Sequence, residues 1–204
     1  MWHEFEKAYV NRDPCKIPIN AYDSLVAAAP FEHSKTLFWS KTKNLVRDLT
    51  KNRDDVNLEK TLLGSVLDGL TWCGKMGSRE TFTKGCPEWK ECENNPPRSF
   101  WKRLSTAFAD FAREDVTVIL DGSIDTPFDP ESTFATIEVK RIKYPKVKSL
   151  TVVIVPQKSN CNIESLKALK SALVQGITYN CKEVTKAQIK KCSSDPKRPI
   201  GKCW

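Results

Sequence analysis

Four short segments combine tryptophan, hydroxyl, carboxylate and lysine side chains at spacings that could hold a small ligand. These segments are Leu37–Lys41, Leu58–Cys73, Ser99–Ser105 and Asp129–Val139. A phosphate-binding glycine loop is excluded, because neither GxxxxGKS/T nor GxGxxG occurs. A Ser-His-Asp triad is not favoured either, since the two histidines are His3 near the terminus and His33 in a predicted loop.

The elements of the first half are mainly helical. Residues 1–30 predict short helical pieces and residues 35–40 a short buried strand. Asn57 can cap a helix that begins at Leu58 and runs to about Leu70, and Ser99 opens a helix to Phe111. In this second helix Trp101 and Ser105 share a face beside the core stripe. They could form a ligand shelf, although a tryptophan packed on another helix has the same spacing.

The second half changes character. Two unbroken apolar runs, 116–120 and 150–155, predict buried strands. An amphipathic helix over 163–174, with Gly176 as its C-cap, and a strand over 176–180 complete a βαβ unit.

These elements predict an α/β fold. A helical N-terminal lobe packs on a small parallel-sheet C-terminal lobe, with a central cleft between them. The predicted ranges are 1–33 and 57–112 for the helical lobe, and 34–56 and 113–204 for the sheet lobe. Ligands of such sheets bind beyond the carboxyl ends of the strands.

The chain contains eight cysteines and no CxxC pair, so their spacing does not fit a zinc site. We therefore expect four disulfides and an oxidising compartment. Eight cysteines allow 105 connectivities. Short loops favour Cys73–Cys86, Cys161–Cys181 and Cys192–Cys203, which leaves Cys15 for Cys92.

The net charge of +8 is unevenly distributed. Residues 143–204 contain 13 Lys or Arg against 3 Asp or Glu, so the rest of the chain is slightly acidic. Such a basic lobe could attract nucleic acid, anionic glycans or a phosphorylated small substrate, or it could be a solvated lysine-rich surface. Few aromatic residues accompany the lysines, which argues against single-stranded nucleic acid. No apolar stretch approaches the ~18 residues of a membrane span.

The order and spacing of five motifs resemble the ADP-ribosyl cyclase family, ecto-enzymes that cleave NAD to nicotinamide and ADP-ribose or its cyclic form. The motifs are Thr61-Leu-Leu-Gly, Leu70-Thr-Trp-Cys-Gly, Glu93-Asn-Asn-Pro, Ser99-Phe-Trp-Lys and Ser132-Thr-Phe. The resemblance covers almost the whole chain and implies that residues 36–39 join the C-terminal sheet. It also implies NAD or NADP as substrate, no further cofactor or metal, no nucleic-acid partner and an extracellular location, either secreted or as an anchored ectodomain.

The resemblance implies roles for individual residues. Glu138 is similar to the catalytic glutamate, Glu59 to the acidic residue that orients substrate, and Trp39 and Trp101 to the pocket tryptophans. The remaining pocket positions are Ser40, Lys41, Asp68, Ser105, Thr133 and Phe134. Each acidic residue has a plainer interpretation. Glu138 suits the exposed face of a strand, Glu59 the first turn of a helix, and Asp68 the far side of that helix if it is straight.

The implied chemistry needs one carboxylate. Nicotinamide in NAD is a pyridinium cation and departs as a neutral base, so no general acid is required. Glu138 would stabilise the oxocarbenium-like transition state or attack it to form a ribosyl ester. An indole over the ring attracts the cation by roughly 0.5–2 kcal/mol, which mainly positions it.

Two departures from the family pattern bear on function. The vertebrate members have one further disulfide, and this chain has Glu32-His33-Ser34 and Arg113-Glu114 in place of its two cysteines. Lys41 stands where arginine is common. Thr133 resembles the residue of the hydrolysing members, whereas the molluscan type has a bulky aromatic ring there. The smaller Thr133 should admit water, so we expect mainly ADP-ribose and little cyclic product. Two other hypotheses remain: a secreted receptor or ligand module of the same fold, and a polyanion-binding protein acting through residues 143–204.

Overall fold

The computed structural model describes residues 1–31, 35–156 and 158–204, which form two units. Unit 1 consists of Met1–Glu32 and Leu62–Ala107, and unit 2 of His33–Thr61 and Phe108–Trp204. Residues 57–61, which the sequence-based ranges place with the helices, belong to unit 2.

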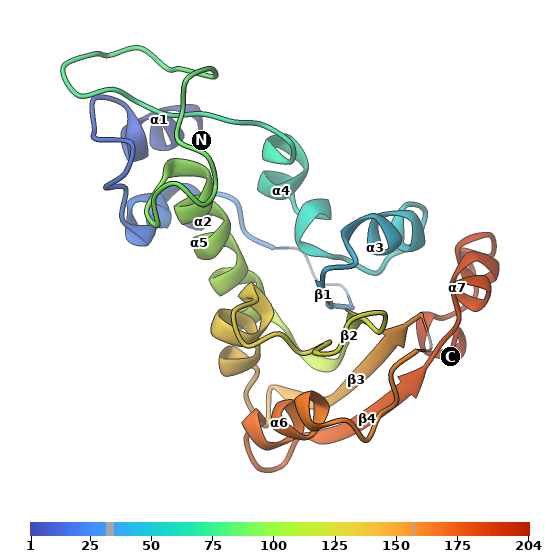
Figure 1. Ribbon diagram of the computed structural model, residues 1–204. Helices are drawn as coiled ribbons and strands as arrows, with labels where there is room; N and C mark the ends of the chain where they lie inside the picture. The colour runs from blue at the N-terminus through green and yellow to red at the C-terminus, as the bar shows by residue number, and fades with distance from the viewer. Residues whose placement is uncertain (32–34, 157) are drawn as a thin grey trace. The chain divides into compact units, whose positions relative to one another are not determined.

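Unit 2 contains a four-stranded parallel sheet in the order β1-β2-β3-β4 (Figure 1). The strands are β1 (Leu37–Ser40), β2 (Glu114–Asp121), β3 (Val147–Val155) and β4 (Thr178–Glu183). Leu37 in β1 lies opposite Thr117 in β2, so the segment before Lys41 joins the C-terminal sheet. The predicted α/β fold with a parallel sheet is confirmed.

The two faces of the sheet are covered by different elements. One face packs against α3 (Lys43–Thr50), α7 (Lys186–Ser193) and η5 (Ile200–Lys202) in a core cluster that includes Ile119 and Val153. On the other face, the Phe38 ring meets the Phe108 and Phe134 rings at centroid distances of 5.4 and 5.8 Å. Burial of these strands explains their near-continuous apolar runs. Helix α6 (Glu164–Ala172) connects β3 to β4 (Figure 1).

Three short helical turns complete the regular structure of unit 2. They are the 3₁₀ turns η2 (Leu58–Lys60) and η4 (Val139–Arg141) and the π-helical turn η3 (Phe134–Glu138).

Unit 1 is built from helices around an aromatic core. Its elements are α1 (Trp2–Tyr9), η1 (Ile19–Tyr22), α2 (Asp23–Ala27), α4 (Leu62–Leu67) and all but the last turn of α5 (Pro96–Phe111). Trp72 packs edge-on against Phe100 at 5.6 Å, and its Nε1 donates to the Tyr22 hydroxyl at 3.0 Å. Burial of this hydroxyl raises the pKa of Tyr22 above its ordinary value.

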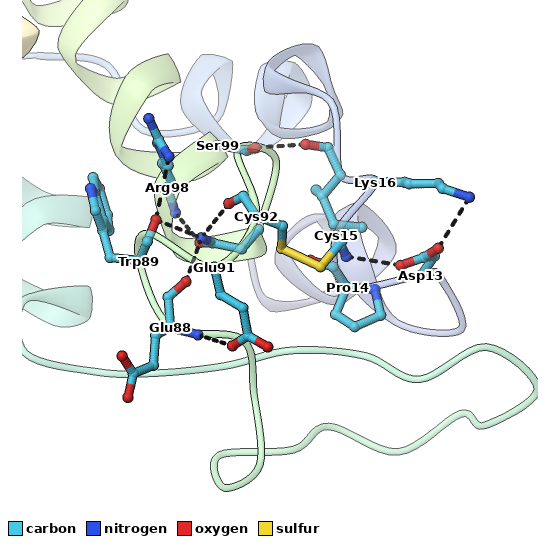
Figure 2. Close-up of a disulfide and its surroundings, with 12 residues drawn as sticks. Asp13, Pro14, Cys15, Lys16, Glu88, Trp89, Glu91, Cys92, Arg98 and Ser99 are labelled. Atoms are coloured by element: carbon cyan, nitrogen blue, oxygen red, sulfur yellow. Dashed lines mark hydrogen bonds and ion pairs between the residues drawn. A yellow bond between two sulfur atoms is a disulfide. The ribbon is translucent and has the colours of Figure 1, made fainter. Parts of the chain in front are cut away.

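Each of the four disulfides joins two cysteines of the same unit. Cys15–Cys92 and Cys73–Cys86 lie in unit 1, and Cys161–Cys181 and Cys192–Cys203 in unit 2. This is the pairing that the loop lengths favour. Figure 2 shows Cys15–Cys92 joining the Asp13–Lys16 segment to the Glu88–Cys92 segment. Such a bridge closes a long loop of the unfolded chain and therefore stabilises the irregular residues 73–95.

Helix α5 begins earlier than the sequence suggests. Ser99 is not its first residue, because the helix starts at Pro96 and Asn95 precedes it. The Asn95 Oδ1 accepts from the backbone N–H of Arg98 at 2.9 Å, and proline suits the first helical position because its missing N–H has no helical partner to lose. Ser99 instead donates its hydroxyl to the Ile17 carbonyl at 2.6 Å.

We expect Asn95→Ala to destabilise the protein by about 2 kcal/mol. The amide of this buried side chain also donates to the carbonyls of Glu88, Trp89 and Cys92, so alanine removes a cap and leaves carbonyls without donors. Urea unfolding with the disulfides intact measures the loss. Asn94→Ala, next to it and exposed, is the control, and equal stability of the two variants would contradict the prediction.

Two further expectations about helices are wrong. No continuous helix covers residues 58–70, because Thr61 is extended (ψ 158°) and separates η2 from α4. Asn57 forms no side-chain cap, and its amide is used elsewhere. Gly176 does not cap α6, which ends at Ala172. Gly176 instead lies in the turn before β4 with a φ of +99°, and the Tyr144 ring leaves no room for a Cβ there.

No helix within the described ranges is long and apolar enough to cross a bilayer. The place of the missing family disulfide at residues 32–34 lies outside the described residues, and so does His33.

Candidate active site

Several predicted site residues of unit 2 meet at the carboxyl end of β1. Trp39 and Ser40 are the last two residues of β1, and Lys41 follows directly. The connection from β2 to β3 returns to this strand: η3 contacts β1, and Asp129 pairs with Lys41 just after its end. Ser40 is buried and Trp39 packs against the core cluster. This edge of a parallel sheet is where ligands are expected.

Trp39 and Glu59 are joined directly. The Trp39 Nε1 donates to Glu59 Oε2 at 3.0 Å, and the Asn57 amide donates to the same oxygen at 2.9 Å. Asn57 is almost fully buried, so it fixes the carboxylate in one orientation. Glu59 lies in η2 rather than at the start of a long helix, and its carboxylate accepts a hydrogen bond from a tryptophan. The indole edge and an acidic group are thus held as one assembly.

Lys41 is positioned by the loop before η3. Its Nζ lies 2.8 Å from Asp129 Oδ2, and the φ of Lys41 is +60°, a conformation that is uncommon for residues other than glycine and is enriched at ligand sites. Asp129 Oδ1 accepts from the Glu131 N–H at 2.9 Å. The Ser132 hydroxyl donates to the Asp129 carbonyl at 2.7 Å and accepts from the Ala135 N–H at 3.1 Å. These bonds order the loop that carries Thr133, which is exposed.

We expect the Lys41–Asp129 pair to stabilise the protein only above acidic pH. The hydrogen bond from Lys41 lowers the pKa of Asp129 below 3.8. A carboxyl with a lowered pKa in the folded state contributes stability above its ordinary pKa and loses it as the pH falls through the lowered value. Because the pair is partly exposed, its contribution should be below about 1 kcal/mol.

Urea unfolding of wild type and Asp129→Asn measures that contribution. The difference should be present at pH 7 and shrink progressively as the pH is lowered below the ordinary pKa of an aspartate, while the exposed Asp125→Asn changes stability little at any pH. A difference that stays constant with pH would contradict the assignment.

Glu138 ends the π-helical turn η3 and is 6% exposed. The strand interpretation of Ile137-Glu-Val139 is therefore wrong, since the backbone is helical and the carboxylate is buried. Phe134, at the start of the same turn, packs its ring on Phe38 of β1 and is 1% exposed. π-Helical turns occur frequently at functional sites. A buried carboxylate held by such a turn is better suited to a catalytic role than to the role of a solvated surface residue.

Three predicted site residues belong to unit 1. Trp101 and Ser105 lie one turn apart in α5, where Ser105 is buried and Trp101 is partly exposed. The Trp101 ring contacts Phe100 edge-on at 5.1 Å. Asp68 follows the last residue of α4, so the argument from a straight helix does not apply to it.

Two residues have roles that the sequence does not predict. Asn57 orients Glu59 instead of capping a helix, and Asp129 pairs with Lys41. The sequence nevertheless contains two signals for these roles. Asn57 stands two residues before Glu59 in an irregular segment, and Asp129-Pro-Glu-Ser is typical of a turn.

Comparisons with known proteins agree with one another. The family model described as ADP-ribosyl cyclase matches residues 1–201. Mouse ADP-ribosyl cyclase/cyclic ADP-ribose hydrolase 1 is 34% identical over 206 residues, covering 96% of this chain and 68% of the mouse protein. The ADP-ribosyl cyclase/cyclic ADP-ribose hydrolase of Aplysia californica is 28% identical, covering 96% of this chain and 73% of its own.

Solved structures give the same result. Porcine CD38 complexed with a covalent intermediate, ribo-F-ribose-5'-phosphate, is 35% identical with a TM-score of 0.83, covering 90% of this chain and 84% of that one. Aplysia cyclase complexed with substrate NGD and product cGDPR is 27% identical with a TM-score of 0.82, covering 100% of this chain and 84% of that one.

Proposed function

The chain belongs to the ADP-ribosyl cyclase family, and from this premise we propose that it cleaves the nicotinamide–ribose bond of NAD and releases mainly ADP-ribose. It is an enzyme that acts on N-glycosyl bonds. NAD or NADP is the substrate, and no other cofactor, metal or nucleic-acid partner takes part. Four disulfides fit an extracellular site of action.

One observation carries this proposal. At the carboxyl end of β1, Trp39 is bonded to Glu59, and the turn ending at Glu138 contacts the same strand. The indole supplies a negative face for the pyridinium ring, and the carboxylates favour a substrate whose reacting end is cationic. Lys41 binds the diphosphate together with the Thr133–Phe134 loop. Its ammonium group acts as a point charge. In unit 1, Trp101, Ser105 and Asp68 are the proposed residues for the remaining contacts with the substrate.

Glu138 performs the chemical step. As the bond to nicotinamide lengthens, positive charge moves from the ring to the ribose, and the carboxylate stabilises it there or forms a ribosyl ester. Because nicotinamide leaves as a neutral base, no proton donor is needed. Water then attacks the ribosyl carbon, the bond to Glu138 breaks where an ester has formed, and loss of a proton to solvent gives ADP-ribose.

Incubation of the protein with NAD, followed by chromatography of the products, tests the proposal. We expect nicotinamide to equal the sum of ADP-ribose and cyclic ADP-ribose, with ADP-ribose as the main product and cyclic ADP-ribose as a minor one. Absence of nicotinamide release would instead support the receptor or ligand module. Cyclic ADP-ribose as the main product would refute the assignment of Thr133.

We expect Thr133→Phe to raise the cyclic fraction at least several-fold. Thr133 is exposed and small, so water reaches the ribosyl intermediate, whereas a phenyl ring would exclude water and hold the adenine over it. The ratio of cyclic to linear product at equal turnover measures the effect. Thr136→Phe, exposed on the same segment, is the control, and an equal shift in both variants would show that bulk alone is responsible.

A further inference from the structure

A cavity lies on the sheet of unit 2, at the amino-terminal half of the strands. It has a volume of about 410 Å³. Its floor is a row of directly opposed residues across all four strands: Leu37, Thr117, Thr151 and Asn180. Trp39 and Ser40 stand at the other end of β1, so this cavity is separate from the candidate active site. Its volume is within the range of small-molecule sites.

Three of the four floor residues, Thr117, Thr151 and Asn180, are polar, whereas the same face is otherwise apolar. One step further along the strands, Ile119 and Val153 pack under α3 and α7. At the row of Thr117 and Thr151, that covering is replaced by the cavity. Hydroxyl and amide groups there can donate or accept hydrogen bonds. The sheet therefore presents a polar surface to the cavity.

The roof is held rigidly over this floor. It is formed by Pro199–Lys202 and Trp204, and Trp204 packs against the core cluster. Buried Arg53 donates to the carbonyls of Cys192 and Asp195 at 3.2 and 2.9 Å, so it anchors the segment that leads to the roof. A cavity built in this way needs little reorganisation to accept a ligand.

A buried carboxylate lines the cavity with one oxygen unused. Asp55 is 7% exposed, and its Oδ2 lies 3.5 Å from Arg53 Nε. Its Oδ1 has no hydrogen-bond partner among the residues that the structure describes. Burial raises the pKa of Asp55, and the charges of Arg53 and Lys35 oppose that rise. This oxygen is itself shielded from solvent, so a ligand donor reaches it when the Asp55 side chain turns toward the cavity. Because buried acceptors are normally paired, such a contact would satisfy it.

Cations and an aromatic ring surround the same space. Lys35, Lys182 and Lys202 line the cavity, and none of them forms an ion pair within residues 1–31, 35–156 and 158–204. The other acid of the cavity, Asp115, accepts from the Ser149 hydroxyl at 2.5 Å. Unpaired ammonium groups attract phosphate, and the Trp204 indole offers a face for a planar base.

We propose that this cavity binds a nucleoside monophosphate: a ribose hydroxyl donates to Asp55 Oδ1, the lysines bind the phosphate, and the base stacks on Trp204. Such a group exists alone or as part of a larger nucleotide. The site is independent of the proposed cleavage reaction.

Titration calorimetry with AMP tests the proposal. Lys182→Ala and Trp204→Ala, both at accessible positions, should each weaken AMP binding about tenfold, and Asp55→Asn by at least as much. The matched controls Lys190→Ala and Asp54→Asn change exposed residues outside the cavity and should bind AMP as the wild type does. Unchanged binding in both Lys182→Ala and Trp204→Ala would overturn the proposal, even if Asp55→Asn fails to fold.

Two further arms separate the possible sources of binding. Trp39→Ala should retain AMP binding in this cavity, whereas loss of all binding in that variant would place AMP at the candidate active site and overturn the proposal. Ribose 5-phosphate should bind more tightly than inorganic phosphate and less tightly than AMP. If inorganic phosphate binds as tightly as AMP, the lysines alone account for binding and the nucleoside assignment is wrong. Nicotinamide release by Lys182→Ala should equal that of the wild type.

Discussion

Glu138→Gln should reduce the rate of nicotinamide release from NAD by about 1,000-fold, equivalent to ~4 kcal/mol of transition-state stabilisation. Glutamine has nearly the shape of glutamate, so it can occupy the buried position at the end of η3 without a cavity. It carries no negative charge, so it neither stabilises an oxocarbenium ion nor forms an ester. The loss should fall on kcat, because charge develops on the ribose only as the bond breaks.

The matched control is Glu131→Gln, which removes the same charge from an exposed position in the same loop. Its nicotinamide release should stay within about twofold of the wild type. Thermal unfolding of both variants separates catalysis from folding, since Glu138→Gln should melt close to the wild-type temperature. If a folded Glu138→Gln protein releases nicotinamide at a rate within tenfold of the wild type, the carboxylate is not catalytic and the proposed mechanism fails.

The sheet could be predicted from the sequence because its signals are local. Residues 116–120 and 150–155 are unbroken runs of mainly β-branched residues, and they lie within β2 and β3. The pairing of Cys161 with Cys181 follows from a short loop that brings the ends of neighbouring elements together. That residues 36–39 join this sheet is not local information, and the family resemblance alone implied it; the position of β1 at the edge of the sheet was not predicted.

The details of the site could not be predicted because they depend on contacts between distant segments. Lys41 and Asp129 are separated by 88 positions, and nothing near either residue identifies its partner. The three residues Ile137-Glu-Val139 fit a strand as well as a helical turn, and only packing of the preceding Phe134 on β1 selects the turn. Asn57 could cap a helix, but its amide bonds the Glu59 carboxylate instead.

Trp39→Ala should lower kcat/KM for NAD by about 30- to 100-fold. The variant loses the ring that attracts the pyridinium, worth roughly 0.5–2 kcal/mol, and also the packing of the indole against the core cluster. It further removes the Nε1 donor that, at 3.0 Å, holds Glu59. Trp39→Phe keeps an aromatic face but lacks this donor, so we expect a smaller loss of about 3- to 10-fold.

A double-mutant cycle separates the two contributions of Trp39. If its Nε1 positions Glu59, then Trp39→Phe combined with Glu59→Ala should cost less than the sum of the single changes, because both remove the same hydrogen bond. Trp39→Ala should remain worse than Trp39→Phe in the Glu59→Ala background, since the ring face acts on the substrate itself. Trp89→Ala, at a largely exposed tryptophan of unit 1, controls for loss of an indole. Strict additivity would mean that Trp39 and Glu59 act on the substrate independently, and equal rates for Trp39→Ala and Trp39→Phe would exclude a role for the ring face.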